Sequence, residues 1–223
     1  MNNLKRLSLL AALVTVGSAA NAVVVFYGGD FDQRNGLANE RDTAVADSWV
    51  FDDFTLSSAM VVTAVFSNDL SSLTGVTTAD YEIRQGASIG NGGTLLFSGT
   101  GVAATATPTG RTGFGFTEIM YRVGGLNLAM VAGTYHLSVR PVGTTGRSFV
   151  STTQGANSVG APIGNGNGLW NSTSFGQNFS DPSNSLGAGT WDFSIGVEGA
   201  VPEPMTMLAL AGGLFALIAR RRK

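Results

Sequence analysis

The chain has no cysteine, and it has one histidine and six prolines among 223 residues. Without cysteine it can form no disulfide, has no thiol nucleophile and offers no thiolate to a metal ion. Zinc sites use about three protein ligands, usually including histidine or cysteine, so the single His136 argues against one. The folded chain must therefore be stabilised by its hydrophobic core and its sheet pairing.

Basic residues are scarce between the two ends of the chain. Of thirteen lysines and arginines, two lie at positions 5 and 6 and four close the sequence, which leaves seven arginines and no lysine in residues 23–200. Fourteen acidic residues lie in the same stretch, so its formal charge is about −7. A surface of this charge repels phosphate-rich partners, and we expect no binding of nucleic acid.

No part of residues 23–200 has the 3.6-residue apolar period of a surface helix. Short alternating runs recur instead, separated by turns that use many of the 31 glycines, which is the pattern of an all-β protein. The clearest alternation is at residues 135–140. It predicts that Tyr135, Leu137 and Val139 lie in the core and that His136, Ser138 and Arg140 lie at the surface.

We predict eight to ten strands in an antiparallel β-sandwich, with a jelly-roll order favoured over an immunoglobulin-like one. The run Gly90-Asn91-Gly92-Gly93 predicts a tight turn, because glycine and asparagine accept a positive φ. Alternation fades between Val150 and Gly189, where we expect surface loops and two short strands near Phe149 and Phe175.

The first 22 residues have the organisation of a secretory signal peptide. Lys5 and Arg6 form a basic region, and residues 7–16 are apolar apart from Ser8 and Thr15. Small residues then occupy the two positions that a signal peptidase reads, Ala20 and Ala22. We predict cleavage after Ala22, which divides the chain into a signal peptide (1–22), a β-sandwich domain (23–200) and a C-terminal segment (201–223).

The C-terminal segment has three parts. It begins with the motif Val201-Pro202-Glu203-Pro204, whose prolines keep the peptide extended and accessible. An uncharged run follows from Met205 to Ala219, and we predict a single transmembrane helix there, although fifteen residues fall short of the ~20 that span a bilayer comfortably. Four cations close the chain and favour the cytoplasmic side, namely Arg220, Arg221, Arg222 and Lys223.

This order of motif, apolar helix and arginine cluster closely resembles the PEP-CTERM sorting signal of Gram-negative bacteria. The resemblance implies export, transient anchoring in the inner membrane and cleavage near Pro202-Glu203-Pro204 by an exosortase, a membrane-embedded cysteine protease. It also implies an association with exopolysaccharide and the outer cell surface. Phrases in the body, such as Tyr81-Glu82-Ile83-Arg84 and Ala132-Gly133-Thr134-Tyr135, resemble other PEP-CTERM proteins more loosely and imply no activity.

One motif in the body resembles a hydrolase site. Gly86-Ala87-Ser88-Ile89-Gly90 matches the Gly-x-Ser-x-Gly nucleophile elbow, which needs a strand-to-helix turn to expose its serine. Here strands flank the motif, the only base is His136, and Glu118 is the only acid between them. We interpret the motif as a glycine-rich turn, and His136 as a surface residue of a strand.

The remaining acids suggest no catalytic pair. Asp52 and Asp53 are neighbours on a predicted strand, so their side chains point to opposite faces and cannot act together. Asp30, Asp32 and Asn35 faintly resemble a calcium loop, but Arg34 occupies a ligand position, and a solvated acidic loop is the better interpretation. We therefore expect no cofactor, with calcium as the alternative.

Trp170 is the aromatic residue most suited to bind a ligand. Trp49 and Trp191 fall in alternating strands and belong to the core, whereas Trp170 lies in a stretch rich in glycine and asparagine. An exposed indole there could stack on a sugar ring, but a tryptophan that caps the sandwich is the favoured interpretation.

Three functions remain open. The first is an exported, non-catalytic protein of the cell surface or extracellular matrix, sorted through its C-terminal segment. The second is a carbohydrate-binding module that retains the cell's own exopolysaccharide. The third is a hydrolase acting on that polymer, for which the sequence provides no catalytic pair.

Overall fold

The computed structural model describes residues 22–200, and the two ends of the chain lie outside that range. The described part is built almost entirely of antiparallel strands, with one short helix, α1 (Ser183–Leu186). Its strands are β1 Val23–Tyr27, β2 Phe31–Ala38, β3 Trp49–Leu56, β4 Met60–Ser71, β5 Thr78–Gln85, β6 Thr94–Gly113, β7 Phe116–Met130, β8 Gly133–Val142, β9 Ser148–Thr153, β10 Leu169–Ser172, β11 Gln177–Ser180, β12 Asp192–Phe193 and β13 Ile195–Ala200.

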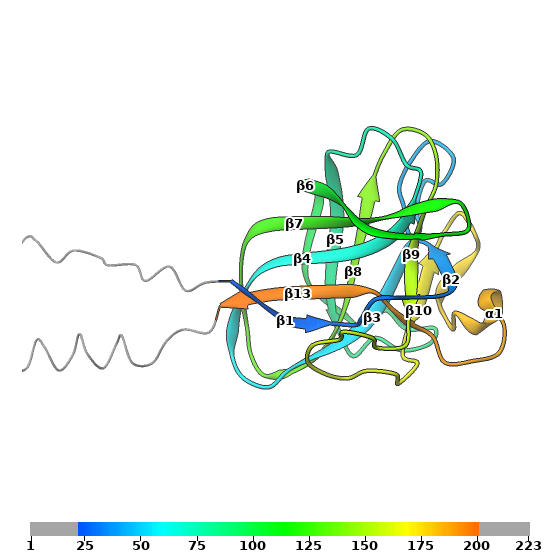
Figure 1. The fold of residues 1–223 in the computed structure, drawn as a ribbon. Coiled ribbons are helices and arrows are strands. Elements are labelled where there is room, and N and C mark those ends of the chain that lie inside the picture. Colours follow the sequence, from blue (N-terminus) through cyan, green and yellow to red (C-terminus); the bar gives the residue numbers. More distant parts are fainter. Residues whose placement is uncertain (1–21, 201–223) are drawn as a thin grey trace, which may run out of the picture. The chain divides into compact units, whose positions relative to one another are not determined.

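The strands form one continuous sheet that bends back on itself. Its order is β1-β13-β4-β7-β6-β5-β8-β3-β10-β11, and β9 joins β4 to β2 and β12. In Figure 1, β7, β4 and β13 run side by side across the view, and β5 and β8 run up the view behind them. The bend occurs within β6, whose first half pairs with β5 and whose second half pairs with β7.

The main core lies between the two halves of this sheet. Phe26 of β1 and Phe54 of β3 lie far apart in the strand order, yet their ring centroids are 5.9 Å apart. Tyr135 of β8 extends the contact, with its ring centroid 5.6 Å from that of Phe54. Burial of such rings supplies the largest favourable term in folding, about 25 cal/mol for each Å² of apolar surface removed from water.

A second, smaller core covers the opposite face of β3. Trp49, Phe51, Leu169 and Phe179 pack together there, and the guanidinium carbon of Arg140 lies 3.6 Å from the centroid of the Trp49 ring. The prediction that the polar face of β8 is exposed is therefore wrong, because His136, Ser138 and Arg140 are buried beneath this second core.

The sequence predicted some strands well and missed others. The sequence pattern predicts strands at Val23–Tyr27 and Trp49–Leu56, and these are the bounds of β1 and β3. The tight turn predicted at residues 90–93 lies slightly earlier, where Ser88 and Asn91 pair across residues 89 and 90. The many charges in residues 28–47 predict a polar stretch without a strand, but β2 lies within it. The pattern also predicts a strand at Thr94–Ser98, whereas β6 continues to Gly113. No helix among residues 22–200 is long and apolar enough to cross a membrane.

Candidate functional site

Most of the predicted sorting residues lie outside the described residues. These are Ala20 of the signal-cleavage pair, the motif from Val201 to Pro204 and the cations from Arg220 to Lys223, together with the predicted membrane helix. Ala22 is the first described residue, and β1 begins directly after it. Strand β13 ends at Ala200, directly before the motif.

Trp170 does not lie in the predicted loop, and the hypothesis that its indole is exposed for a sugar is wrong. The residue lies in β10, where it pairs with Val50 of β3, and it is 5% exposed. Its indole Nε1 donates a hydrogen bond to Oγ of Ser48 at 3.0 Å, and its ring lies 5.3 Å from that of Phe175. A ring buried in this way has no face free for a sugar, so Trp170 is a core residue.

The residues of the candidate calcium loop are bound by separate partners. A carboxylate oxygen of Asp30 lies 2.8 Å from a guanidinium nitrogen of Arg111, and one of Asp32 lies 2.6 Å from Nε of Arg34. Oδ1 of Asn35 accepts a hydrogen bond from the next backbone N–H at 2.9 Å. Within residues 22–200 there is no group of three or more His, Cys, Asp and Glu side chains placed to hold a metal ion.

Asp52 and Asp53 are both buried and have different partners. Asp52 accepts a hydrogen bond from the backbone N–H of Phe193 at 2.5 Å, whereas Asp53 accepts hydrogen bonds from the side-chain amide of Asn165 at 3.1 Å. Complete burial raises the pKa of Asp52 well above its usual value, and the negative charge of Asp192 raises it further. These two carboxylates hold β12 and the 164–168 loop in place through the hydrogen bonds they accept, and they do not face a shared reaction centre.

Ser88 and His136, which the sequence suggested as nucleophile and base, line the same cavity. The cavity measures about 420 Å³ and lies between the 87–89 turn and the loop before β10. We call it the His136 cavity, and its lining consists of Ala87, Ser88, Ile89, His136, Gly166, Asn167, Gly168, Leu169 and Asp181.

The His136 cavity does not contain a catalytic triad. Nδ1 of His136 is buried and has no hydrogen-bond partner among residues 22–200, so no acid orients the imidazole ring. Glu118, the acid suggested from the sequence, is bound to Arg111 and to Thr109 on another part of the sheet. A serine nucleophile needs a hydrogen bond from its hydroxyl to the imidazole of the base, and the base needs an acid that orients its ring. The described residues provide neither for Ser88 and His136.

The electrostatics of the cavity keep His136 neutral. Burial lowers the pKa of the imidazole, and the charge of Asp53, its direct neighbour on β3, acts in the opposite direction. A neutral imidazole offers one donor and one acceptor to a ligand. The sequence pattern assigned His136 to the surface, and only the cover supplied by the 87–89 turn and the loop before β10 makes it part of a cavity.

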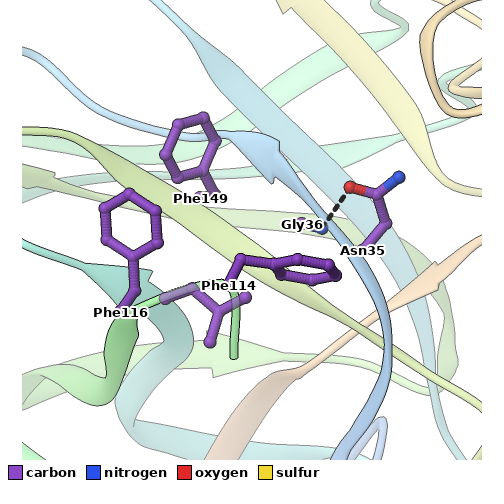
Figure 2. A pocket seen from close by; sticks show the side chains of 6 residues that line it. Asn35, Gly36, Phe114, Phe116 and Phe149 are labelled. Carbon is purple, nitrogen blue, oxygen red and sulfur yellow. Dashed lines mark hydrogen bonds between the residues drawn. The ribbon is translucent and has the colours of Figure 1, made fainter. Parts of the chain in front are cut away.

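A second, apolar pocket lies beside the tip of the β6–β7 hairpin. Figure 2 shows the rings of Phe114, Phe116 and Phe149 around it, with Asn35 at its rim. Its volume is about 150 Å³. Phe114 is 64% exposed and has φ of +53°, an unusual conformation for a bulky residue.

Replacing Phe114 with asparagine is expected to stabilise the protein by about 0.5–1 kcal/mol. Phe114 and Gly115 both have positive φ between paired residues 113 and 116, which is the geometry of a type I′ turn that prefers Asn-Gly. Asparagine tolerates the positive φ better than phenylalanine, which stabilises the folded state. This stabilisation is partly offset by the loss of the edge contact between the rings of Phe114 and Phe31.

Urea unfolding of the wild type and of Phe114→Asn measures this difference. Phe116→Asn is the matched control, because the same chemical change there relieves no positive φ and removes the contact with Phe149. The control is expected to be less stable than the wild type. Equal losses in both variants would show that the exposed ring of Phe114 stabilises the hairpin more than its backbone strain weakens it.

Comparison with known proteins identifies the C-terminal segment. None of the curated proteins compared with the chain matches it. The family described as the PEP-CTERM protein-sorting motif matches residues 200–223, which contain Pro202, Glu203, Pro204 and the terminal cations. The chain is therefore a PEP-CTERM domain-containing protein, a secreted protein whose C-terminal signal is recognised by an exosortase.

Proposed function

We propose that the protein is an exported, non-catalytic component of the cell surface or extracellular matrix, associated with exopolysaccharide and biofilm. The observation that carries this proposal is the PEP-CTERM motif at residues 200–223, directly after the last strand of the folded body. A signal peptide at residues 1–22 starts export, and the apolar run from Met205 to Ala219 holds the chain in the inner membrane until cleavage.

The folded body acts in this proposal as a β-sandwich of jelly-roll type displayed outside the cell. The packing of β1 against β3 across the main core supports a two-layered arrangement. A body without disulfides that is held by a large core and antiparallel pairing is suited to persist outside the cell. Lack of a triad around Ser88 and His136 within the described residues supports a non-catalytic role.

Intact mass and cell fractionation test the proposed sorting. In the host strain the product is expected outside the inner membrane and without its C-terminal segment, whereas a strain that lacks the exosortase is expected to keep the longer form in the membrane. Replacing Pro202, Glu203 and Pro204 with alanine in the normal host is expected to have the same effect, because the cleavage site is lost.

Glu82→Ala is the control for this experiment, since it removes an acid from the body and leaves the motif intact. Its processing is expected to match that of the wild type. A full-length product in the inner membrane of both strains would mean that the C-terminal segment is an ordinary anchor, and the proposal would be abandoned.

A second candidate function is retention of exopolysaccharide by a carbohydrate-binding body. Trp170 no longer supports it, because its ring is buried. The specific observation in its favour is the polar lining of the His136 cavity.

A further inference from the structure

We propose that the His136 cavity binds a neutral saccharide of one or two sugar rings. The cavity measures about 420 Å³, within the range of small-molecule sites, and it combines polar side chains with an apolar wall. This inference rests on the proposed function only for the source of the saccharide, the exopolysaccharide of the producing cell. The chemistry of the site stands on the residues that line it.

The polar side chains of the lining match the hydroxyl groups of a sugar. Each hydroxyl can donate one hydrogen bond and accept others. Ser88 offers another hydroxyl, Asn167 an amide, Asp181 a carboxylate and His136 a neutral imidazole, so donors and acceptors are both present.

His136 forms part of the wall of the cavity and is mostly buried. The residue is 9% exposed, and its Nδ1 is buried without a hydrogen-bond partner among residues 22–200. Buried polar atoms in folded proteins nearly always have a partner. Nδ1 is closed to solvent, so a sugar hydroxyl can reach the exposed edge of the imidazole ring and not Nδ1 itself.

The charge of the cavity excludes acidic ligands. No lysine or arginine lines it, while Asp181 does. The two cross-strand neighbours of His136 are Asp53 on β3 and Arg84 on β5, and Arg84 is already paired with Glu82. A phosphate or carboxylate group would therefore meet the charge of Asp181 without a cation in the lining to compensate it. The side chains of Ala87, Ile89 and Leu169 instead provide an apolar surface for the C–H face of a sugar ring.

Both loops that form the cavity are fixed in position before any ligand binds. Asp53 accepts hydrogen bonds from the amide of Asn165 at 3.1 Å, and Asp192 accepts one from the backbone N–H of Gly166 at 2.9 Å. The backbone N–H of Gly90 donates to the carbonyl of Phe179 at 2.9 Å, which holds the 87–89 turn against β11. A preformed site of this kind loses little conformational entropy on binding.

Isothermal titration calorimetry tests the inference directly. The full chain, in a detergent without a sugar headgroup, is titrated with glucose, galactose, mannose, N-acetylglucosamine and their disaccharides, and with glucuronic acid and glucose 6-phosphate. At least one neutral sugar is expected to bind, and the two acidic sugars are not. Ser88→Ala and Asn167→Ala are each expected to weaken that binding by roughly fivefold to tenfold.

Two further variants make the outcome decisive. Ser88→Trp is expected to abolish binding without lowering the melting temperature, because Ser88 is exposed and a large side chain there fills the cavity. Asn178→Ala, an exposed asparagine on β11 outside the cavity, is expected to bind like the wild type.

Failure to bind any neutral sugar, preference for an acidic sugar, or unchanged binding by Ser88→Trp would each overturn the inference. None of these results bears on sorting, which fractionation measures without any saccharide. Conversely, a protein that binds sugar but stays full-length in the membrane would contradict the proposed function and leave the saccharide site in place.

Discussion

Replacing Asp80 with alanine is expected to lower the free energy of unfolding by about 3–5 kcal/mol, because it breaks a buried ion-pair network. The Asp80 carboxylate is fully buried and accepts hydrogen bonds from Nε and Nη2 of Arg41 at 2.8 and 2.9 Å. It also accepts one from Nε of Arg140 at 3.0 Å and one from the backbone N–H of Gly101 at 2.7 Å.

The loss is large because the substitution leaves a cation without its partner in the interior. Arg140 is 6% exposed and lies between Trp49 and Asp80, so it cannot move into water without disturbing the second core. It would retain only Asp47, a carboxylate at the surface end of its side chain. A buried charge that loses one partner costs far more than a surface pair contributes.

Glu82→Ala is the matched control, on the same strand and the same face of the sheet. Glu82 and its partner Arg84 are both partly exposed, and their contact at 2.6 Å is expected to contribute about 1 kcal/mol or less. Urea unfolding at pH 7 of both variants and the wild type measures the difference. Equal losses would mean that Asp80 acts as an ordinary surface acid, contrary to its contacts.

This network shows why the sequence predicted only one of the two faces of β8. The alternation at residues 135–140 correctly identified the inward face, because Tyr135, Leu137 and Val139 are apolar and buried. The other face is polar, and a polar face normally indicates exposure to water. Here Arg140 is neutralised by Asp80 and Asp47, acids distant in the sequence, and no local pattern encodes that pairing.

The length of strand β6 was underestimated for a different physical reason. Residues 99–113 are mostly glycine, alanine and threonine, and most of their side chains are exposed, so the stretch has no apolar alternation. Its extended form depends on hydrogen bonding to β5 on one side and β7 on the other. Pairing between strands is a tertiary property, and the pattern of a single strand cannot report it.

The candidate cavity could be predicted only in part. Its glycine-rich turn and Ser88 were noticed through a motif, and His136 because it is the only histidine. No local pattern indicates that Asn167 and Asp181 lie beside them, because both residues belong to the stretch between Val150 and Gly189 in which alternation fades. Trp170 was misplaced because glycine and asparagine around it suggested a loop, whereas β10 pairs it with β3 in the core.

The stability of the protein is expected to fall as the pH rises from about 4 to 7, and Asp69 is one source of this effect. Complete burial raises the pKa of Asp69 from its usual 3.8 to about 7, although hydrogen bonds from Asn39 at 3.1 Å and Ser148 at 3.0 Å act in the opposite direction. Nearby Glu40 adds a negative charge that raises the pKa of Asp69 further.

The direction of this effect follows from proton binding. Between pH 3.8 and about 7 the folded protein keeps the proton on Asp69, whereas the unfolded chain has released it, so raising the pH favours unfolding. The difference between the two pKa values corresponds to a loss of roughly 4 kcal/mol at most, complete by about pH 7. Asp52 contributes in the same direction, because complete burial raises its pKa well above the usual value.

Asp69→Asn separates this effect from the rest of the protein. Asparagine is neutral at every pH and keeps an oxygen that can accept the hydrogen bonds from Asn39 and Ser148. The variant is therefore expected to show a smaller decrease in stability between pH 4 and 7 than the wild type, and to be more stable than the wild type at pH 8. Unfolding in urea at several pH values measures both quantities.

Glu198→Gln provides a control of opposite sign. Hydrogen bonds from Arg122 at 2.7 and 2.6 Å lower the pKa of Glu198, so this acid stabilises the folded protein above its usual pKa and loses that effect as the pH falls. Its variant should be less stable than the wild type at pH 8 and similar to it in strong acid. If Asp69→Asn were also less stable at pH 8, the ionised carboxylate of Asp69 would have to be well stabilised in the folded state, contrary to the effect expected from its complete burial between Asn39 and Ser148.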